Sequence, residues 1–322
     1  MPPAQRNHFL ATVVSNTLLC REHYRLTLQL VRFPPTAPGQ FVQIACRPVE
    51  EAVEGECEFE WNEGRSTRVC GRNLVAPGAL LRRPFSLAGR RDIKGYVELD
   101  VIHRVVGVGT QWLSHLSAGE QVSLIGPLGN RFELPPEGCT AILVAGGVGI
   151  PPMLYLAEKL KGRAVAFVGA TSHDLLPVTI SAYPVPTPTT FTPARTVAEF
   201  ARFDIASTVS TDDGSYGFRG YVTQALEGYL DSICGNPRAS VMIYTCGPEP
   251  MMKRVAEIAR SRSLPCQVAV ERSMACGLGT CQSCVIRVHK PDARNVPLPG
   301  NSWCYRLACT DGPIFNASDL LW

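Results

Sequence analysis

Residues 275–285 have the sequence A-C-G-L-G-T-C-Q-S-C-V, with three cysteines in a C-x4-C-x2-C pattern. This is the ligand spacing of a plant-type [2Fe–2S] loop, which takes one further cysteine from elsewhere in the chain. Three thiolates can converge on one small cluster only if the loop curls tightly around it. Gly277 and Gly279 permit such a curl, because glycine adopts positive φ without steric cost. The three cysteines are Cys276, Cys281 and Cys284.

Two other roles are open to these cysteines. Four cysteines could bind zinc, although structural zinc sites usually take two C-x2–4-C pairs from separate places. Disulfides are the other alternative. The fourth cluster ligand would be Cys304 or Cys309, both of which follow the loop in the chain.

The composition is that of an ordinary soluble globular protein of two or three domains. The chain has 322 residues, of which 45% are hydrophobic and 18% charged, with a formal net charge of +3. This balance gives no argument for a nucleic-acid partner. The 13 cysteines are scattered and odd in number, unlike those of a secreted disulfide scaffold. The sequence has no signal-peptide pattern and no apolar run of about 18 residues. We therefore expect a cytoplasmic protein without a membrane partner.

Short alternating runs separated by turn residues dominate the first segment, and they predict an antiparallel barrel or sandwich. A single short helix is expected at 110–116. Residues 47–81 are too long and too polar for a simple barrel connection, so we interpret them as an insertion that could form a short hairpin and touch a partner. The expected strands cover residues 8–14, 24–30, 41–45, 96–104 and 121–125.

Two motifs in this segment have the chemistry of a cofactor site. R-P-F-S at 83–86 offers an arginine for a phosphate, an aromatic ring to stack on a flat ring, and a serine hydroxyl for a ring nitrogen. G-V-G-T at 107–110 precedes the expected helix, and a glycine turn at a helix N-terminus exposes free N–H groups to a phosphate. Each motif alone also fits a structural role, as a strand start and a capped turn respectively.

The second segment, residues 136–265, alternates apolar strands with helical runs. An apolar strand at 139–144 leads into G-G-V-G-I-P-P at 146–152 and then into a helix, which is the phosphate-binding unit of nucleotide folds. The G-x-G-x-x-G template is not met, because Pro152 stands where the third glycine belongs. Asp174 could accept a ribose 2′-hydroxyl, and the absence of a nearby arginine cluster favours NAD over NADP. A later strand ends in C-G-P at 246–248.

Taken in this order, the motifs resemble the ferredoxin–NADP reductase superfamily. In that superfamily the R-x-[YF]-S element contacts flavin and phosphate, and a later glycine–threonine pair holds the pyrophosphate. The resemblance implies FAD contacts at Arg83, Pro84, Phe85, Ser86, Gly109 and Thr110, with Ile102, His103 and Arg104 on the adenine side. It implies nicotinamide contacts at Gly146, Gly147, Gly149, Cys246, Gly247 and Pro248. Cys246 would pack there without covalent chemistry, or it is simply a small apolar residue at a strand end.

The last segment narrows the resemblance. The pattern E-R-x-M-A-C-G-x-G-x-C-x-x-C at 271–284, followed by C-x-D-G-P-I-F at 309–315, resembles the electron-transfer subunit of NAD-dependent (class 1B) dihydroorotate dehydrogenase. T-D-D-G-S-Y-G-x-x-G-x-V-T at 211–223 is similar to the same family. In that family the fourth ligand precedes the D-G-P turn. The resemblance therefore implies Cys276, Cys281, Cys284 and Cys309 as the cluster ligands.

The resemblance implies three domains: an FAD-binding β-barrel at 1–135, an NAD-binding α/β parallel-sheet domain at 136–265, and a small C-terminal [2Fe–2S] domain at 266–322. The implied activity is electron transfer from the FMN of a dihydroorotate dehydrogenase catalytic subunit, through [2Fe–2S] and FAD, to NAD⁺ in pyrimidine biosynthesis. The implied assembly is a heterotetramer of two catalytic and two electron-transfer subunits. No acid–base constellation for dihydroorotate is present, so no catalytic residue is assigned.

Two rival functions remain open. The first is a subunit of another NAD(P)H-dependent flavin and iron–sulfur reductase, of the ferredoxin:NAD(P) oxidoreductase, sulfide dehydrogenase or hydrogenase diaphorase type. Several of those proteins have aspartate in place of the first cluster cysteine, so Cys276 favours the dihydroorotate family. The second is a non-catalytic regulator that carries a cluster or zinc, which would contain no flavin.

Overall fold

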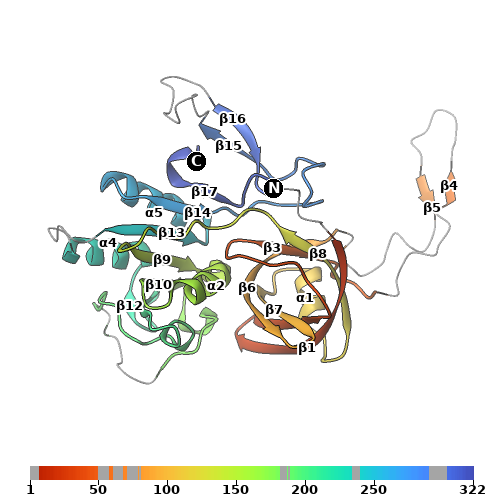
Figure 1. Cartoon of the computed structure of the whole chain (residues 1–322), viewed down its shortest axis with the longest axis horizontal. Helices are drawn as coiled ribbons and strands as arrows, with labels where there is room; N and C mark the ends of the chain where they lie inside the picture. The colour runs from red at the N-terminus through yellow and green to blue at the C-terminus, as the bar shows by residue number, and fades with distance from the viewer. Residues whose placement is uncertain are drawn as a thin grey trace.

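The computed structural model describes residues 7–49, 58–60, 68–70, 79, 81–181, 187, 189–233, 240–289 and 303–322. Figure 1 shows a barrel, coloured red to yellow, beside a layered α/β body, coloured green to light blue. A small blue unit near the C-terminus lies above both. No helix in the described part of the chain is long and apolar enough to cross a membrane.

Six antiparallel strands close into the barrel in the order β1-β2-β7-β6-β3-β8. The predicted antiparallel barrel is thereby confirmed. Closure leaves no unpaired strand edge, and alternate side chains such as Leu26, Leu28 and Leu99 are fully buried inside. The strands are β1 (Asn7–Cys20), β2 (His23–Leu30), β3 (Phe41–Ile44), β6 (Arg83–Ile93), β7 (Tyr96–Arg104) and β8 (Gln121–Leu128).

The expected strands omitted β6, which begins at R-P-F-S. Its second half, Arg90-Arg91-Asp92, is too polar to show an apolar alternation. Those charges are paired: Arg91 Nη1 lies 2.5 Å from Asp100 Oδ2, and Arg90 Nη2 lies 2.7 Å from Asp92 Oδ1. An ion pair to β7 and another within β6 thus replace apolar packing at this end of the strand. The short helix α1 (Val108–Ser114) begins two residues before its expected start.

Part of the insertion forms the hairpin that the sequence suggested. β4 (Glu58–Glu60) pairs with β5 (Arg68–Cys70) in antiparallel register, with Phe59 opposite Val69. Most of the remaining residues between 50 and 80 lie outside the described residues. Contact of this insertion with a partner stays a prediction.

The α/β body is built on a seven-stranded sheet in the order β12-β11-β10-β9-β13-β14-β17. The predicted parallel sheet is confirmed for its six neighbouring strands, while β17 runs antiparallel to β14. Helices cover both faces, so β9 is apolar along its length rather than alternating. The strands are β9 (Thr140–Gly146), β10 (Ala164–Ala170), β11 (Ala206–Thr211), β12 (Phe218–Arg219), β13 (Val241–Cys246), β14 (Cys266–Ala269) and β17 (Ile314–Asn316). The helices are α2 (Ile150–Leu160), α3 (Ala198–Ala201), α4 (Val222–Ile233) and α5 (Glu249–Ser261).

The third unit contains the hairpin of β15 (Val285–His289) and β16 (Trp303–Leu307). The segment beyond residue 265 also supplies β14 and β17 to the sheet. The chain therefore crosses between the α/β body and the cluster segment more than once. The domain boundaries at 135 and 265 stay predictions.

The barrel and the α/β body meet at Tyr155 of α2, which is 1% exposed and belongs to the barrel's core cluster. Its hydroxyl lies 2.7 Å from Thr36 Oγ1 and donates to the Thr36 carbonyl oxygen at 3.1 Å. These bonds join α2 to the loop between β2 and β3. The junction therefore combines a buried aromatic ring with a polar tip.

We expect Tyr155→Phe to lower the free energy of unfolding by about 1 kcal/mol, the usual net worth of one hydrogen bond. Urea unfolding followed by circular dichroism would measure the change. Tyr305→Phe is the matched control, because Tyr305 is 62% exposed and should lose little. Equal effects of the two substitutions would contradict a stabilising role for the Tyr155 hydroxyl at this junction.

Candidate functional site

The cluster loop turns its backbone N–H groups toward its first cysteine. The N–H groups of Leu278 and Cys281 donate to Cys276 Sγ at 3.3 and 3.4 Å. Gly277 and Gly279 have φ of 68° and 86°, so the predicted glycine curl is present. Hydrogen bonds to the ligand sulfurs are among the features that tune an iron–sulfur cluster.

The second loop cysteine is prepared in a similar way. Cys281 Sγ lies 3.2 Å from Ser283 Oγ. Hydrogen bonds from Ser283, with further ones at Cys276, lower the pKa of Cys281 to about 6. Cys281 would therefore be largely a thiolate at neutral pH without any metal charge nearby.

The structure places Cys309, and not Cys304, beside the loop cysteines. The Ala308 N–H donates to the Cys284 carbonyl oxygen at 3.0 Å, and Cys284 and Cys309 are 2% and 1% exposed. Burial, and then a hydrogen bond with the Cys284 thiol, raise the pKa of Cys309 to about 12. Cys304 instead lies opposite Val288 on the hairpin. This geometry favours Cys309 as the fourth ligand, which stays a prediction.

The donor set fits a two-iron cluster. Within the described residues, no three His, Cys, Asp or Glu side chains gather as ligands of a single metal ion. A [2Fe–2S] cluster does not need that arrangement, because its four thiolates are shared between two irons. Four thiols from two chain segments, with N–H groups directed at sulfur, are suitable donors for such a cluster.

The two glycine turns predicted to hold nicotinamide lie against each other at the carboxyl ends of the neighbouring strands β9 and β13. A methyl group on Gly149 would lie 2.1 Å from the Cys246 carbonyl oxygen, and one on Gly247 would lie 3.0 Å from the Gly146 nitrogen. Gly149 is the N-cap of α2, and proline occupies the first turn of that helix, where its missing N–H has no partner to lose. This end of a parallel sheet is where nucleotides bind.

Polar groups near this edge are available to a ligand. The Thr245 hydroxyl on β13 and the Ser210 hydroxyl on β11 are buried and have no partner among the described residues. Asp174, by contrast, is already paired, since Arg21 Nε lies 3.1 Å from its Oδ2. Burial raises the pKa of Cys246 to about 12, so its thiol stays protonated and unreactive at neutral pH.

The R-P-F-S and G-V-G-T motifs approach each other around Cys46, just after β3. Burial raises the pKa of Cys46 to about 12, and the positive charge of the Arg83 guanidinium partly opposes that rise. A methyl group on Gly109 would lie 3.2 Å from Cys46 Cβ. The structure thus brings together the arginine and the helix start that were predicted to share a flavin's phosphates.

Two members of these motifs are already engaged. Phe85 is 8% exposed and packs in the barrel core, so a stacking role on a flat ring is a prediction that this structure does not display. The Thr110 hydroxyl accepts from the Val106 and Gly107 N–H groups at 2.9 and 3.1 Å. That threonine therefore caps its own turn, as the structural alternative proposed.

His103 on β7 is buried beside Phe85, with 6.0 Å between ring centroids, and it stacks on Tyr24. It is 2% exposed, and neither ring nitrogen has a partner among the described residues. A bound group with an acceptor atom could satisfy the one N–H of the neutral ring. Burial, with a smaller contribution from His23, lowers the pKa of His103 to about 4.

This burial predicts acid destabilisation. Between about pH 6.5 and pH 4 the unfolded state binds the His103 proton and the folded state does not, so the free energy of unfolding falls as pH falls, by at most about 3 kcal/mol. His103→Gln should flatten that part of the profile in urea unfolding at a series of pH values. His115→Gln, at an exposed position, should keep the wild-type slope. An unchanged slope in His103→Gln would show that another group titrates.

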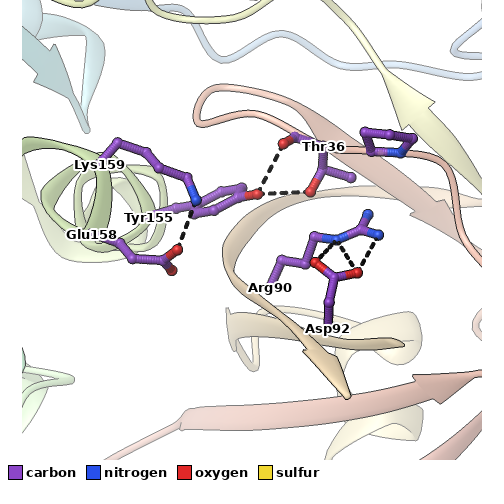
Figure 2. A pocket seen from close by; sticks show the side chains of 7 residues that line it. Thr36, Arg90, Asp92, Tyr155, Glu158 and Lys159 are labelled. Carbon is purple, nitrogen blue, oxygen red and sulfur yellow. Dashed lines mark hydrogen bonds and ion pairs between the residues drawn. The ribbon is translucent and has the colours of Figure 1, made fainter. Parts of the chain in front are cut away.

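A cavity of about 480 Å³ lies at the junction of the barrel and α2, and Figure 2 shows its side chains. Its charges are matched within it: Arg90 pairs with Asp92, and Lys159 Nζ lies 2.8 Å from Glu158 Oε1. Lys159 Nζ also lies 5.5 Å from the centroid of the Tyr155 ring. With no unpaired charge to offer a ligand, we assign this cavity to the junction and not to the functional site.

The comparisons with known proteins agree with this architecture. Residues 271–321 match the family model of the iron–sulfur cluster binding domain of dihydroorotate dehydrogenase B. A dihydroorotate dehydrogenase B (NAD(+)) electron transfer subunit of Geobacillus thermodenitrificans is 33% identical over 96% of this chain and 97% of its own length. The Streptococcus mutans subunit of the same name is 32% identical over 87% and 94%. The chain belongs to this family.

Among solved structures, an NADH-dependent reduced ferredoxin–NADP oxidoreductase has a TM-score of 0.66 at 24% identity, covering 100% of this chain and 92% of that one. The ferredoxin reductase of carbazole 1,9a-dioxygenase has a TM-score of 0.56 at 17% identity, covering 82% and 68%. These likenesses show the reductase fold. They do not favour the rival reductase activities, since they are much more distant than the dihydroorotate dehydrogenase B subunits.

Two residues that touch the cluster segment of this dihydroorotate dehydrogenase B family member were not predicted from the sequence. Gln43 of β3 contacts the loop at Cys276 and Gly277, and Asn130 after β8 contacts the D-G-P turn. Gln43 lies within the expected strand at 41–45, where nothing in the sequence pointed to a partner. Asn130 lies just beyond the expected strand at 121–125, and its residue type alone indicated no partner.

Proposed function

We propose that this chain is an electron-transfer subunit that carries electrons from the FMN of a dihydroorotate dehydrogenase catalytic subunit to NAD⁺, in pyrimidine biosynthesis. The observation that supports this most strongly is the 33% identity over 96% of the chain to a subunit of that name. The chain's own residues provide a place for each carrier. When bound, an iron–sulfur cluster exchanges single electrons, and a flavin exchanges single electrons on one side and a hydride on the other.

The residues divide into three groups by the carrier that they would hold. For the cluster, the buried thiols of Cys284 and Cys309 would face the N–H-bonded thiols of Cys276 and Cys281. For NAD, the turns that contain Gly149 and Cys246 would offer backbone N–H groups at the sheet edge. For FAD, the predicted residues are Arg83, Pro84, Phe85, Ser86, Ile102, His103, Arg104, Gly109 and Thr110.

The proposal extends to assembly and location. The catalytic subunit that binds dihydroorotate would be a separate chain, in a heterotetramer of two catalytic and two electron-transfer subunits. Reduced thiols are expected in the cytoplasm, and we propose that compartment. The ten cysteines whose side chains the structure describes are all free thiols.

The test is to co-express this chain with the catalytic subunit encoded in the same organism and to purify the complex anaerobically. We expect flavin and iron in the complex, bleaching of both chromophores by NADH, and NAD⁺ reduction by dihydroorotate. The catalytic subunit alone should not reduce NAD⁺. Bleaching by NADH together with electron transfer from ferredoxin or sulfide, but not from dihydroorotate, would favour the rival reductases. A colourless protein that binds zinc would overturn the proposal.

A further inference from the structure

The outer face of β3 and β6 carries residues of two different predicted sites. Val42 and Ile44 are buried in the barrel's core cluster, so their neighbours Phe41 and Gln43 point outward, because side chains alternate along a strand. The opposite positions on β6 are Ser86 for Phe41 and Pro84 for Gln43, both predicted flavin contacts. Flavin-binding positions therefore share one face with Phe41 and Gln43.

That same face meets the cluster segment. Phe41 belongs to the apolar core cluster that contains Cys284 and Cys309. Gln43 is fully buried, and its amide lies against the peptide between Cys276 and Gly277. With the amide oriented for hydrogen bonding, its nitrogen is 3.2 Å from the Cys276 carbonyl oxygen and its oxygen is 3.2 Å from the Gly277 nitrogen. A buried amide is costly unless it is paired, and this peptide is its partner.

A second barrel amide holds the other ligand segment. Asn130 Nδ2 donates to the carbonyl oxygens of Asp311 and Ile314 at 3.0 and 2.8 Å, and the Ile314 N–H donates to Asn130 Oδ1 at 2.9 Å. The Asn130 N–H also donates to the Gly312 carbonyl oxygen at 2.6 Å. This turn begins two residues after Cys309. Both parts of the predicted ligand set are therefore bonded to the barrel.

We infer that Gln43 is a positioning residue for electron transfer: it fixes the first cluster-ligand peptide against the strand that carries R-P-F-S, with Asn130 fixing the second ligand segment. The inference rests on the proposed function, because it assumes a cluster at the four cysteines and a flavin at β6. Gln43 touches no reacting atom itself. Its effect would come from holding the loop in one place, since a displaced ligand changes both the cluster's environment and its distance from the flavin.

The test uses the full complex with Gln43→Met, which keeps the side-chain length and removes both polar contacts. We expect the reduced cluster's electron paramagnetic resonance spectrum to change. Reduction of the cluster by NADH should slow by about tenfold, because a ligand loop that is no longer fixed lies less precisely relative to the flavin. Reduction of the flavin by NADH, which comes before it, should keep its rate. Gln43→Asn keeps the amide but is too short to reach the same peptide. It should change the cluster spectrum and slow cluster reduction in the same direction, and it replaces the methionine variant if that variant folds poorly.

Gln267→Met is the matched control. Gln267 is also a buried glutamine, 3% exposed, and its Oε1 accepts from the Glu133 N–H at 3.0 Å rather than from the cluster loop. It should lose stability but keep the wild-type cluster spectrum and cluster reduction rate. Identical spectra and rates in the Gln43 and Gln267 variants would overturn the inference. Wild-type protein without a cluster, or inert to NADH, would instead overturn the proposed function.

Discussion

Cys309→Ala is expected to leave the protein without its iron–sulfur cluster, whereas Cys304→Ala should keep it. Cys309 is buried beside Cys284, and the Ala308 N–H bonds the Cys284 carbonyl oxygen at 3.0 Å. Removing its thiol leaves one iron short of a ligand, and no other described cysteine lies at that position. Cys304 instead lies within the β15–β16 hairpin, opposite Val288.

The measurement is iron and acid-labile sulfide per chain in anaerobically purified protein, with the visible spectrum alongside. Flavin content should stay near the wild-type level in both variants, because the barrel is unchanged. Iron near zero in Cys309→Ala and near wild type in Cys304→Ala is the expected pair of results. The reverse pair would make Cys304 the fourth ligand. Wild-type iron in both variants would remove Cys309 from the ligand set.

Gly149→Ala should have the second large effect, on reaction with NADH. Its new methyl group would lie 2.1 Å from the Cys246 carbonyl oxygen and 2.5 Å from the Gly247 nitrogen. These are backbone atoms, so the two turns must separate. Overpacking of this kind costs about 1–3 kcal/mol, and the upper value corresponds to roughly a hundredfold slower bleaching of the flavin by NADH.

Gly147→Ala is the comparison for that variant. Nothing lies within 4 Å of a methyl group at Gly147, although its φ is +51°. An alanine there carries only the backbone strain of about 1–2 kcal/mol, so its loss of rate should be the smaller of the two. Stopped-flow mixing with NADH would measure both variants. Wild-type bleaching in Gly149→Ala would remove this turn from the nicotinamide site.

The barrel could be predicted, and the cluster loop proposed, because their signals are local. The spacing of Cys276, Cys281 and Cys284 is visible within nine residues, and short alternating runs indicate an antiparallel barrel wherever they occur. The strand β6 was missed because arginine and aspartate occupy its second half. In the folded chain Arg90 pairs with Asp92 within β6, and Arg91 pairs with Asp100 on β7, a partner that no local pattern reveals.

The contacts of Gln43 and Asn130 could not be predicted for a different reason. Gln43 meets Gly277, and Asn130 meets Ile314, across separations of more than 180 residues. Neither residue type specifies a partner by itself, because an amide can donate or accept almost anywhere. Only the closed barrel, and the path of the chain after β14, bring these amides to the cluster segment.

The antiparallel strand β17 (Ile314–Asn316) completes the edge of the sheet beside β14. During synthesis, β14 would therefore leave the ribosome with an unpaired side, and that side would stay open until residues 314–316 had followed. The chain between β14 and β17 includes Cys309. The nucleotide-binding sheet and the ligand set are thus completed at the same stage of synthesis. A chain halted before that point would display both an open strand and loose thiols, two features that quality-control proteases and chaperones can detect.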